Sequence, residues 1–168
     1  AVNIILPPSS TSSSLLRYWD CNENSGSILH DKSTYGNNGT LKNGTQWTTG
    51  KSGSALKFDG VDDYAEIPNS ASLNTSQAIT IEAWVNLATL PSTMSTTYPG
   101  YFGKSGVFWF DWSKSTNKLK WEWYDSHGAV HVLVSSTVFQ TNTWYHVVYS
   151  FDGTGAKAYV NGALEAVQ

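Results

Sequence analysis

The sequence predicts an all-β fold, a sandwich of two antiparallel sheets of the jelly-roll type, and three observations support this prediction. From Leu15 onward, nearly every segment alternates apolar and polar residues with a period of two, which is typical of half-buried strands. Turn signals such as Asp59-Gly60 and Asn161-Gly162 separate these segments about every 8 to 12 residues. No stretch sustains helical spacing of apolar residues over about 11 positions, which excludes parallel α/β folds.

The alternation assigns individual strands and their faces. In residues 118–124, lysine and glutamate alternate with Leu119, Trp121 and Trp123. In residues 144–151, every second residue from Tyr145 to Phe151 is apolar or aromatic and forms one face of a strand. Asn161-Gly162 predicts a two-residue hairpin turn, because such turns need positive φ at both central positions. The strands assigned in this way cover residues 79–87, 107–112, 118–124, 129–139, 144–151 and 156–160.

Composition limits the classes of protein and partner. The chain has 168 residues, 14% of them charged and 14% aromatic, with a net charge of -3, which indicates one globular domain with an ample core. The negative charge favours neither nucleic acid nor an anionic membrane, so we expect no nucleic-acid partner. No segment approaches the roughly 20 apolar residues that span a bilayer, so we expect no membrane insertion. Cys21 is the only cysteine, which excludes a disulfide framework within the chain.

The two ends of the chain differ in character from its body. Residues 1–14 contain a short apolar run, a double proline and a serine and threonine tract, which predicts an N-terminal arm or linker. Residues 15–168 form the predicted jelly-roll domain. Few charges, many small polar residues, abundant tryptophan and tyrosine, and three Asn-x-Ser/Thr sequons favour an extracellular or cell-surface protein.

Several strings, taken together, resemble a laminin G-like, concanavalin A-like jelly roll. They are YWDCNENSGSILHDKSTYGNNGTLKNGTQW, GKSGSALKFDGVDDYAEIP, ITIEAWV and WYHVVYSFDGTGAKAYVNGALE, and their order matches from about Leu15 to the end. The resemblance implies two antiparallel sheets, one of them concave, and a domain that binds glycans or proteins outside cells. The family usually continues with further strands after the NGALE hairpin, so we expect residues 15–168 to be C-terminally incomplete and to leave an open sheet edge.

Catalytic signals are weak. Jelly-roll glycosidases need two carboxylates that alternate along one strand toward the cleft, and no E-x-D-x-E string is present. Glu122 and Asp125 are three residues apart, which directs them to opposite faces of a strand. No G-x-S-x-G elbow accompanies the four histidines. We therefore expect a protein that is not an enzyme, with a fragment of a glycoside hydrolase as one alternative.

Aromatic residues are concentrated between residues 101 and 124. Rings occupy both faces of the strand at 107–112, and one core face cannot absorb both sets, so some of these rings should face solvent. Exposed tryptophan on a sheet is what a sugar ring needs for stacking, whereas core packing is the alternative for any single ring. The predicted ligand-binding residues are Trp109, Trp112, Trp121, Trp123 and Tyr124.

The loop Asp59-Gly60-Val61-Asp62-Asp63-Tyr64 gathers carboxylates in a turn. Calcium takes carboxylate and carbonyl oxygens from closely spaced turns, and the resemblance to domains with a structural calcium at the sandwich rim points to Asp62 and Asp63 as ligands. The alternative is a β-turn with solvated carboxylates.

These expectations together favour a non-catalytic extracellular recognition module within a larger or multi-subunit protein. Its expected partner is a glycan or another cell-surface or matrix ligand, bound for recognition or adhesion. The alternative is a structural subunit of an extracellular fibre or particle. In that reading the apolar run at residues 2–6 pairs with the open sheet edge of another copy and the chain self-associates into a filament.

Overall fold

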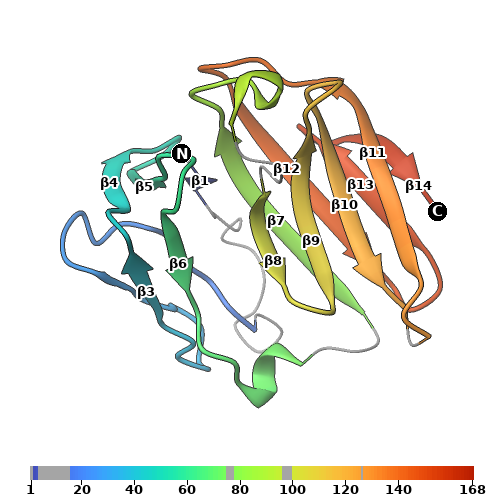
Figure 1. The fold of residues 1–168 in the computed structure, drawn as a ribbon. Coiled ribbons are helices and arrows are strands. Elements are labelled where there is room, and N and C mark those ends of the chain that lie inside the picture. The colour runs from blue at the N-terminus through green and yellow to red at the C-terminus, as the bar shows by residue number, and fades with distance from the viewer. Residues whose placement is uncertain (1, 4–15, 75–77, 96–99, 126) are drawn as a thin grey trace. The chain divides into compact units, whose positions relative to one another are not determined.

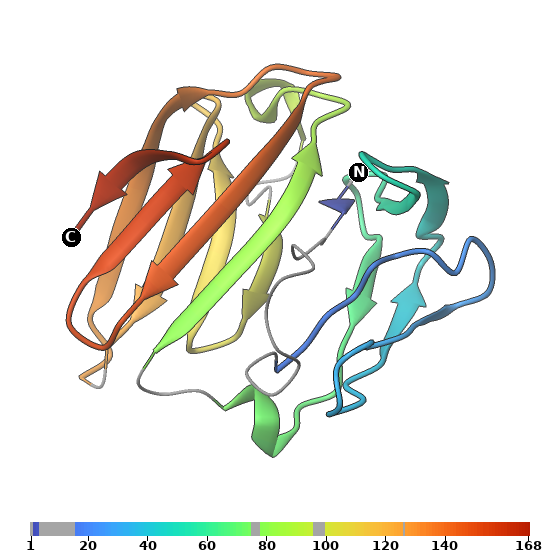
Figure 2. The same ribbon diagram turned by 180° about the vertical axis from the view of Figure 1, so that it is seen from behind.

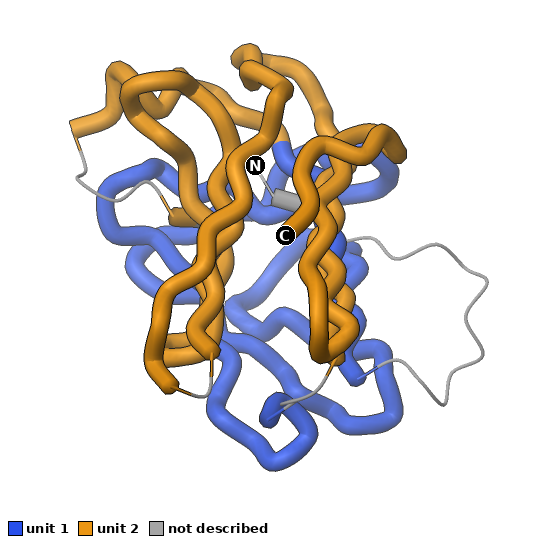
Figure 3. The backbone as a smooth tube through the Cα atoms, turned by 90° about the vertical axis from the view of Figure 1, so that its right-hand side faces the viewer, with its two compact units in different colours: residues 1–76, 82–85 blue, residues 77–81, 86–168 orange. Residues whose placement is uncertain are grey.

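The computed structural model describes residues 2–3, 16–74, 78–95, 100–125 and 127–168, which fall into two compact units (Figure 3). Unit 1 comprises residues 1–76 and 82–85, and unit 2 comprises residues 77–81 and 86–168, so strand β7 (Ile79–Asn86) contributes to both. Strands dominate both units, and the described residues contain two short 3₁₀ turns but no α-helix.

Unit 1 consists of short antiparallel strands. One sheet has the order β2-β3-β6, and β4, β5, β1 and the unit 1 part of β7 are neighbours in another. A 3₁₀ turn, η1 (Ala71–Leu73), follows β6. The strands are β1 (Val2–Asn3), β2 (Ile28–Leu29), β3 (Gly39–Lys42), β4 (Gln46–Thr49), β5 (Ser54–Lys57) and β6 (Tyr64–Glu66).

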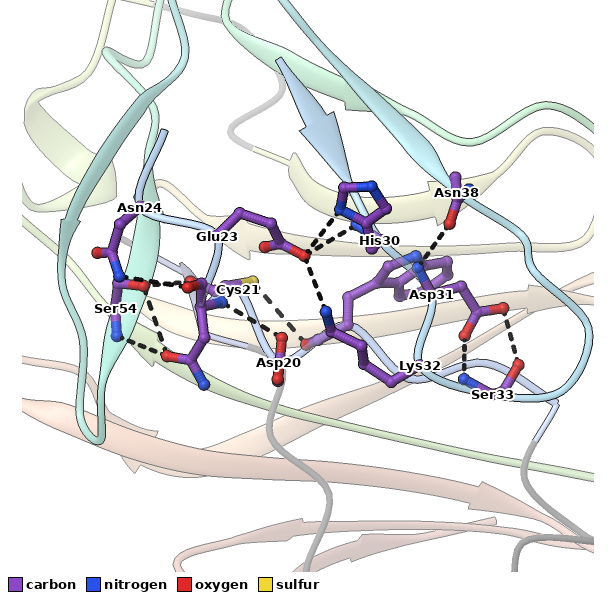
Figure 4. A network of polar contacts seen from close by, with 12 residues as sticks. Asp20, Cys21, Glu23, Asn24, His30, Asp31, Lys32, Ser33, Asn38 and Ser54 are labelled. Atoms are coloured by element: carbon purple, nitrogen blue, oxygen red, sulfur yellow. Dashed lines mark hydrogen bonds and ion pairs between the residues drawn. The ribbon is translucent and has the colours of Figure 1, made fainter. Parts of the chain in front are cut away.

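A small core and a network of polar contacts stabilise unit 1. Trp19, Cys21 and Leu56 are among its buried residues. Figure 4 shows part of the network, in which the Asp31 carboxylate accepts hydrogen bonds from the Ser33 backbone N–H at 2.9 Å and from the Ser33 hydroxyl at 2.8 Å. Burial alone would raise the pKa of Asp31, but hydrogen bonds from Tyr18, Ser33 and Asn37 outweigh it and lower that pKa. These contacts hold a long loop in place where strands are short.

Unit 2 is a sandwich of two antiparallel sheets (Figures 1 and 2). One sheet has the order β11-β10-β9-β8, and the other places β14, β13 and β12 beside the unit 2 part of β7. A 3₁₀ turn, η2 (Pro91–Thr93), precedes the first of these sheets. The strands are β8 (Gly100–Lys104), β9 (Phe108–Ser113), β10 (Lys118–Tyr124), β11 (Val130–Val138), β12 (Trp144–Phe151), β13 (Ala156–Val160) and β14 (Ala163–Val167).

Aromatic side chains fill the space between the two sheets of unit 2. Tyr149 on β12 lies 5.6 Å from Phe110 on β9 and 5.8 Å from Trp123 on β10, measured between ring centroids. Trp121 and Phe139 are almost completely inaccessible to solvent. At one edge of the sandwich, Glu165 of β14 accepts hydrogen bonds from the Thr137 backbone N–H at 2.7 Å and from the Thr137 hydroxyl at 2.8 Å. Because Thr137 lies on β11, these side-chain contacts link the two sheets.

The prediction of an all-β chain with antiparallel sheets is confirmed, and unit 2 is a sandwich of two such sheets. The strands predicted at 118–124, 144–151 and 156–160 coincide with β10, β12 and β13, and Asn161 and Gly162 have the expected positive φ values of 51° and 81°. Within the described part of the chain, no helix has the length and apolar character that a membrane crossing requires.

The N-terminal segment differs from the expectation that residues 2–6 pair with another copy. Val2 pairs with Leu56 and Val85 of the same chain, and Asn3 pairs with Trp84. These two residues therefore occupy a place between β5 and β7 of their own chain. The rest of the predicted arm, residues 4–14, lies outside the described residues.

Candidate functional site

The sheet β8–β11 has one face packed against β12–β14 and an opposite face, the outer face, turned away from them. Antiparallel register places Glu122 between Trp109 of β9 and Val132 of β11, and Lys120 between Asp111 and Val134. Because side chains alternate along each strand, these neighbours share the outer face. The outer-face residues around Glu122 are Trp109, Asp111, Lys120, Tyr124, Val130, Val132 and Val134.

The Trp109 ring packs against the backbone of a glycine. A Cβ atom built on Gly103, its cross-strand partner on β8, would lie 2.3 Å from Cε3 and 2.7 Å from Cζ3 of the indole. The six-membered ring therefore covers the Gly103 backbone, and any side chain at position 103 would displace it. Trp109 nevertheless remains 40% exposed. The outer face thus presents a tryptophan ring supported from below by the sheet and open to solvent.

Three charged side chains form a cluster beside Trp109. The Lys120 ammonium lies 3.1 Å from the Asp111 carboxylate and 2.9 Å from the Glu122 carboxylate. Burial alone would lower the pKa of Lys120, but its hydrogen bonds to Glu122 and Asp111 outweigh burial and raise that pKa. Lys120 therefore stays charged and bridges two carboxylates that come from adjacent strands.

Asp111 is the most enclosed member of this cluster. It is 8% exposed, and its Oδ1 atom is buried without a hydrogen-bond partner. Burial raises the pKa of Asp111, and the hydrogen bond and positive charge of Lys120 offset this only in part. The negative charge of Glu122 raises the pKa further. The cluster therefore holds one cation and two carboxylates, of which Glu122 is the more accessible and Asp111 is enclosed by the sheet.

Tyr124 lies at the end of β10, diagonal to Trp109. Its backbone N–H donates to the Val107 carbonyl at 3.0 Å, and the residue is 36% exposed. Diagonal neighbours on one face of an antiparallel pair are separated by roughly 7 to 8 Å, within reach of aromatic side chains. Two partly exposed rings therefore lie close together on the outer face.

Trp123, which precedes Tyr124, belongs to the inner face. Its ring stacks on His131 with centroids 5.1 Å apart, and His131 Nε2 lies 3.1 Å from Asp125 Oδ2. The hydrogen bond from His131, followed by those from the Ala129 and His127 backbone N–H groups, lowers the pKa of Asp125 to about 2. This arrangement orients the end of the β10–β11 hairpin rather than the outer face.

The structure thus separates the five predicted ligand-binding residues. Trp109 and Tyr124 lie together on the outer face, and Trp123 is half-buried on the inner face. Trp112 and Trp121 are only 4% and 1% exposed, so they are core residues that no ligand reaches at the surface. Their position follows from strand parity, because each points to the side of the sheet that packs against β12–β14.

Sequence reasoning missed the three charged residues of the outer face. Along the sequence the carboxylate closest to Glu122 is Asp125, whereas in the structure Lys120 links Glu122 to Asp111 of β9. Alternation places Asp111 on the side of Trp109, and Lys120 and Glu122 on the side of Tyr124. What the sequence did not supply was the register that brings the two strands together.

A second acidic cluster lies in the β5–β6 loop of unit 1. One oxygen from each of Asp59, Asp62 and Asp63 lies within 4.8 Å of the others. The Asp59 backbone N–H donates to Asp63 Oδ2 at 3.0 Å, whereas Asp63 Oδ1 is buried without a hydrogen-bond partner. Hydrogen bonds from the Val61 and Asp62 backbone N–H groups lower the pKa of Asp59, which keeps it ionised. The donor set suits a hard cation that prefers oxygen ligands, and the orphaned oxygen fits such an ion.

Comparison with protein families now defines the class of protein. Residues 59–168 match a laminin G family model described as the concanavalin A-like lectin/glucanases superfamily. The matched segment covers most of the chain, including all of β8–β14. The chain therefore belongs to this superfamily. No curated protein matches the sequence.

Solved structures with a similar fold include a neurotoxin receptor binding domain, the binding domain of a mosquitocidal protein and part of an S-layer domain-containing protein. The receptor binding domain of botulinum neurotoxin C/D mosaic serotype is 18% identical, with a TM-score of 0.74, over 94% of this chain and 40% of that chain. The binding domain of Paraclostridial Mosquitocidal Protein 1 is 16% identical, with a TM-score of 0.70, over 86% of this chain and 38% of that chain. An S-layer domain-containing protein from Clostridium thermocellum ATCC 27405 is 21% identical, with a TM-score of 0.56, over 90% of this chain and 71% of that chain.

These likenesses concern the fold, since all three identities are low. The chain spans about two fifths of the length of the first two of these chains.

Proposed function

We propose that this chain is a non-catalytic recognition module that binds carbohydrate through the outer face of β8–β11. The observation that carries the proposal is Trp109, whose ring rests on Gly103 and stays 40% exposed. A large aromatic side chain normally gains free energy by burial, so an open ring fixed on a glycine suits an external partner.

The chemistry of a sugar matches the outer face. The C–H face of a pyranose ring is apolar and weakly positive, and it complements the negative face of an indole. The hydroxyl groups at the sugar's edge need donors and acceptors, which Glu122 and Lys120 supply beside Trp109. Tyr124 offers a second ring and a phenol hydroxyl. A few polar groups around an apolar platform give both affinity and orientation.

The charged cluster favours binding over hydrolysis. Glycoside hydrolysis needs two carboxylates with a free space for water or for a covalent intermediate between them and the sugar. Here the Lys120 ammonium bridges Asp111 and Glu122 at 3.1 Å and 2.9 Å, and Asp111 is buried. The Lys120 ammonium occupies the space between the two carboxylates, which leaves no room there for the water or the covalent intermediate that hydrolysis needs. Release of sugar from a bound glycan would contradict this part of the proposal.

An extracellular or cell-surface location accompanies this proposal. It is supported by the sequence composition and by the similar folds, which include a toxin receptor binding domain and a protein with an S-layer domain. The second candidate function, a structural subunit of an extracellular fibre, rests on the valine row Val130, Val132 and Val134, which is 42% to 51% exposed. Such a row on a surface strand is a site for contacts between copies.

A structural calcium ion at the β5–β6 loop is a separate proposal for unit 1. Asp59, Asp62 and Asp63 would hold the ion, and the buried Oδ1 of Asp63 would gain the partner that it lacks. The ion would neutralise three neighbouring carboxylates and fix the loop between two strands.

Glycan binding by the wild-type protein and by matched aromatic variants tests the proposed function. Trp109→Ala should abolish binding on a glycan array and leave the far-UV circular dichroism spectrum unchanged. Tyr159→Ala is the control, because Tyr159 is half-buried on β13 of the opposite sheet. Trp121→Ala should instead cost about 3 to 5 kcal/mol of stability, as a core residue does. Absence of binding to any glycan by the wild type would refute the proposal.

A further inference from the structure

We infer that the outer face selects uncharged glycans and disfavours acidic ones, such as sialylated or sulfated sugars. This inference rests on the proposed function and adds the substrate class. It is carried by the position of two carboxylates, those of Asp111 and Glu122, on either side of Lys120 and beside the exposed Trp109.

The sum of charges around the ring is negative. Glu122 is the direct cross-strand neighbour of Trp109, so a sugar stacked on the indole lies next to a carboxylate. The Lys120 ammonium, which would attract an anionic sugar, is already in contact with two carboxylates at 3.1 Å and 2.9 Å. One positive and two negative groups leave this part of the face with a net charge of about -1 at neutral pH.

More distant charge on the same face does not reverse this sign. Lys118 also lies on the outer side of β10, but its cross-strand neighbours are Ser113 and Val138, at the far end of the strands. Lys118 lies four positions before Glu122, which corresponds to about 13 Å along a strand. That distance exceeds the Debye length of about 8 Å at physiological ionic strength, so screening removes most of its influence at Trp109.

The enclosure of the cluster strengthens the discrimination. Asp111 is 8% exposed, and its Oδ1 atom is an acceptor without a donor. A further anion brought to this place gains no donor from the carboxylates and loses its own hydration. A hydroxyl group, by contrast, donates a hydrogen bond to the accessible Glu122 carboxylate and loses little hydration. The geometry therefore favours a ligand rich in hydroxyl groups and without formal negative charge.

An array of paired glycans tests this inference, with each neutral oligosaccharide printed beside its sialylated and its sulfated forms. The neutral member of each bound pair should give about fivefold stronger binding or more at low salt, because one added negative charge meets an unfavourable potential at contact distance. The difference should shrink at 500 mM salt. Equal or stronger binding of the acidic members would overturn the inference and leave the proposed function intact.

Charge-removing variants attribute the effect to the cluster. Glu122→Gln keeps the size and one acceptor of the side chain, so the protein should fold and the preference for neutral glycans should fall several-fold. Asp152→Asn is the matched control, since it removes one carboxylate from the turn between β12 and β13 and should leave the preference unchanged. An unchanged preference in Glu122→Gln would also overturn the inference. Failure of the wild type to bind any member of the array would instead refute the proposed function itself.

Discussion

At the scale of single residues, strand parity decides which tryptophans pack and which face solvent. Trp109 and Trp112 lie on the same strand, and Trp121 lies on the next, yet their exposures are 40%, 4% and 1%. Odd positions of β9 face outward and even positions face inward, whereas in β10 this relation is reversed. The same residue type therefore stabilises the core in one place and presents a ring in another.

Asp125 gives a prediction about acid stability. Its folded pKa of about 2 lies below its ordinary value of 3.8, chiefly because His131 donates a hydrogen bond to it. A depressed carboxyl pKa contributes stability above pH 3.8, and this contribution is lost as the pH falls toward 2. Asp125→Asn should therefore lower the melting temperature at pH 5 and not at pH 2. Thermal unfolding at pH 5, 3 and 2 measures the difference, and parallel curves for both proteins would contradict the assignment.

The sequence predicted the solvent-facing rings as a group but could not name them individually. It showed that one core face cannot hold the rings on both sides of residues 107–112. Which side faces the core depends on the second sheet, through contacts such as that of Phe110 with Tyr149 at 5.6 Å. Such a contact joins residues far apart in the chain, and no local pattern encodes it.

At the scale of elements, antiparallel register builds the candidate site. Two hairpins bring β9, β10 and β11 side by side, and the pairing of Glu122 with Trp109 and of Lys120 with Asp111 follows from that register. A shift by one residue would turn every one of these side chains to the other face. The alternation of residues 118–124 predicted the strand and its two faces correctly, but the register and therefore the charged cluster came only with the structure.

The β5–β6 loop gives a prediction about calcium. Adding calcium should raise the melting temperature, because the ion binds the folded loop and not the unfolded chain. At a calcium concentration 100 times the dissociation constant, the folded state gains about 2.7 kcal/mol. Asp63→Asn should abolish this increase, since it weakens the ligand with the buried unpartnered oxygen. Glu66→Gln, which alters an exposed carboxylate on β6, is the control. Identical melting curves in calcium and in chelator would exclude the site.

At the scale of the whole molecule, the fold class followed from the sequence, whereas the division into units did not. Period-two alternation and turn signals extend through most of the chain, so they predicted strands throughout, and the structure confirms them. The boundary between units passes through β7, a single strand whose residues 82–85 belong to unit 1 and whose ends belong to unit 2. A continuous strand carries no break in its pattern, which is why composition and periodicity indicated one domain.

The N-terminal strand gives a prediction about assembly. Val2 pairs with Leu56 and Val85 of its own chain, so Val2→Pro, which removes a backbone N–H from the ladder, should cost about 1 kcal/mol of stability or more. Sedimentation should be unchanged, because no contact between copies is lost. Val2→Ile keeps the N–H and is the control. Dissociation of a larger assembly by Val2→Pro, without loss of monomer stability, would favour the fibre alternative.

The central claim, that the outer face of β8–β11 binds carbohydrate through Trp109, is tested most directly by nuclear magnetic resonance. The indole N–H signals of the eight tryptophans can be followed while a glycan selected from the array is titrated into the labelled protein. The account predicts a large saturable shift for the Trp109 indole and small ones for the buried indoles of Trp112 and Trp121. Saturable shifts elsewhere, with the Trp109 signal unmoved, would contradict it.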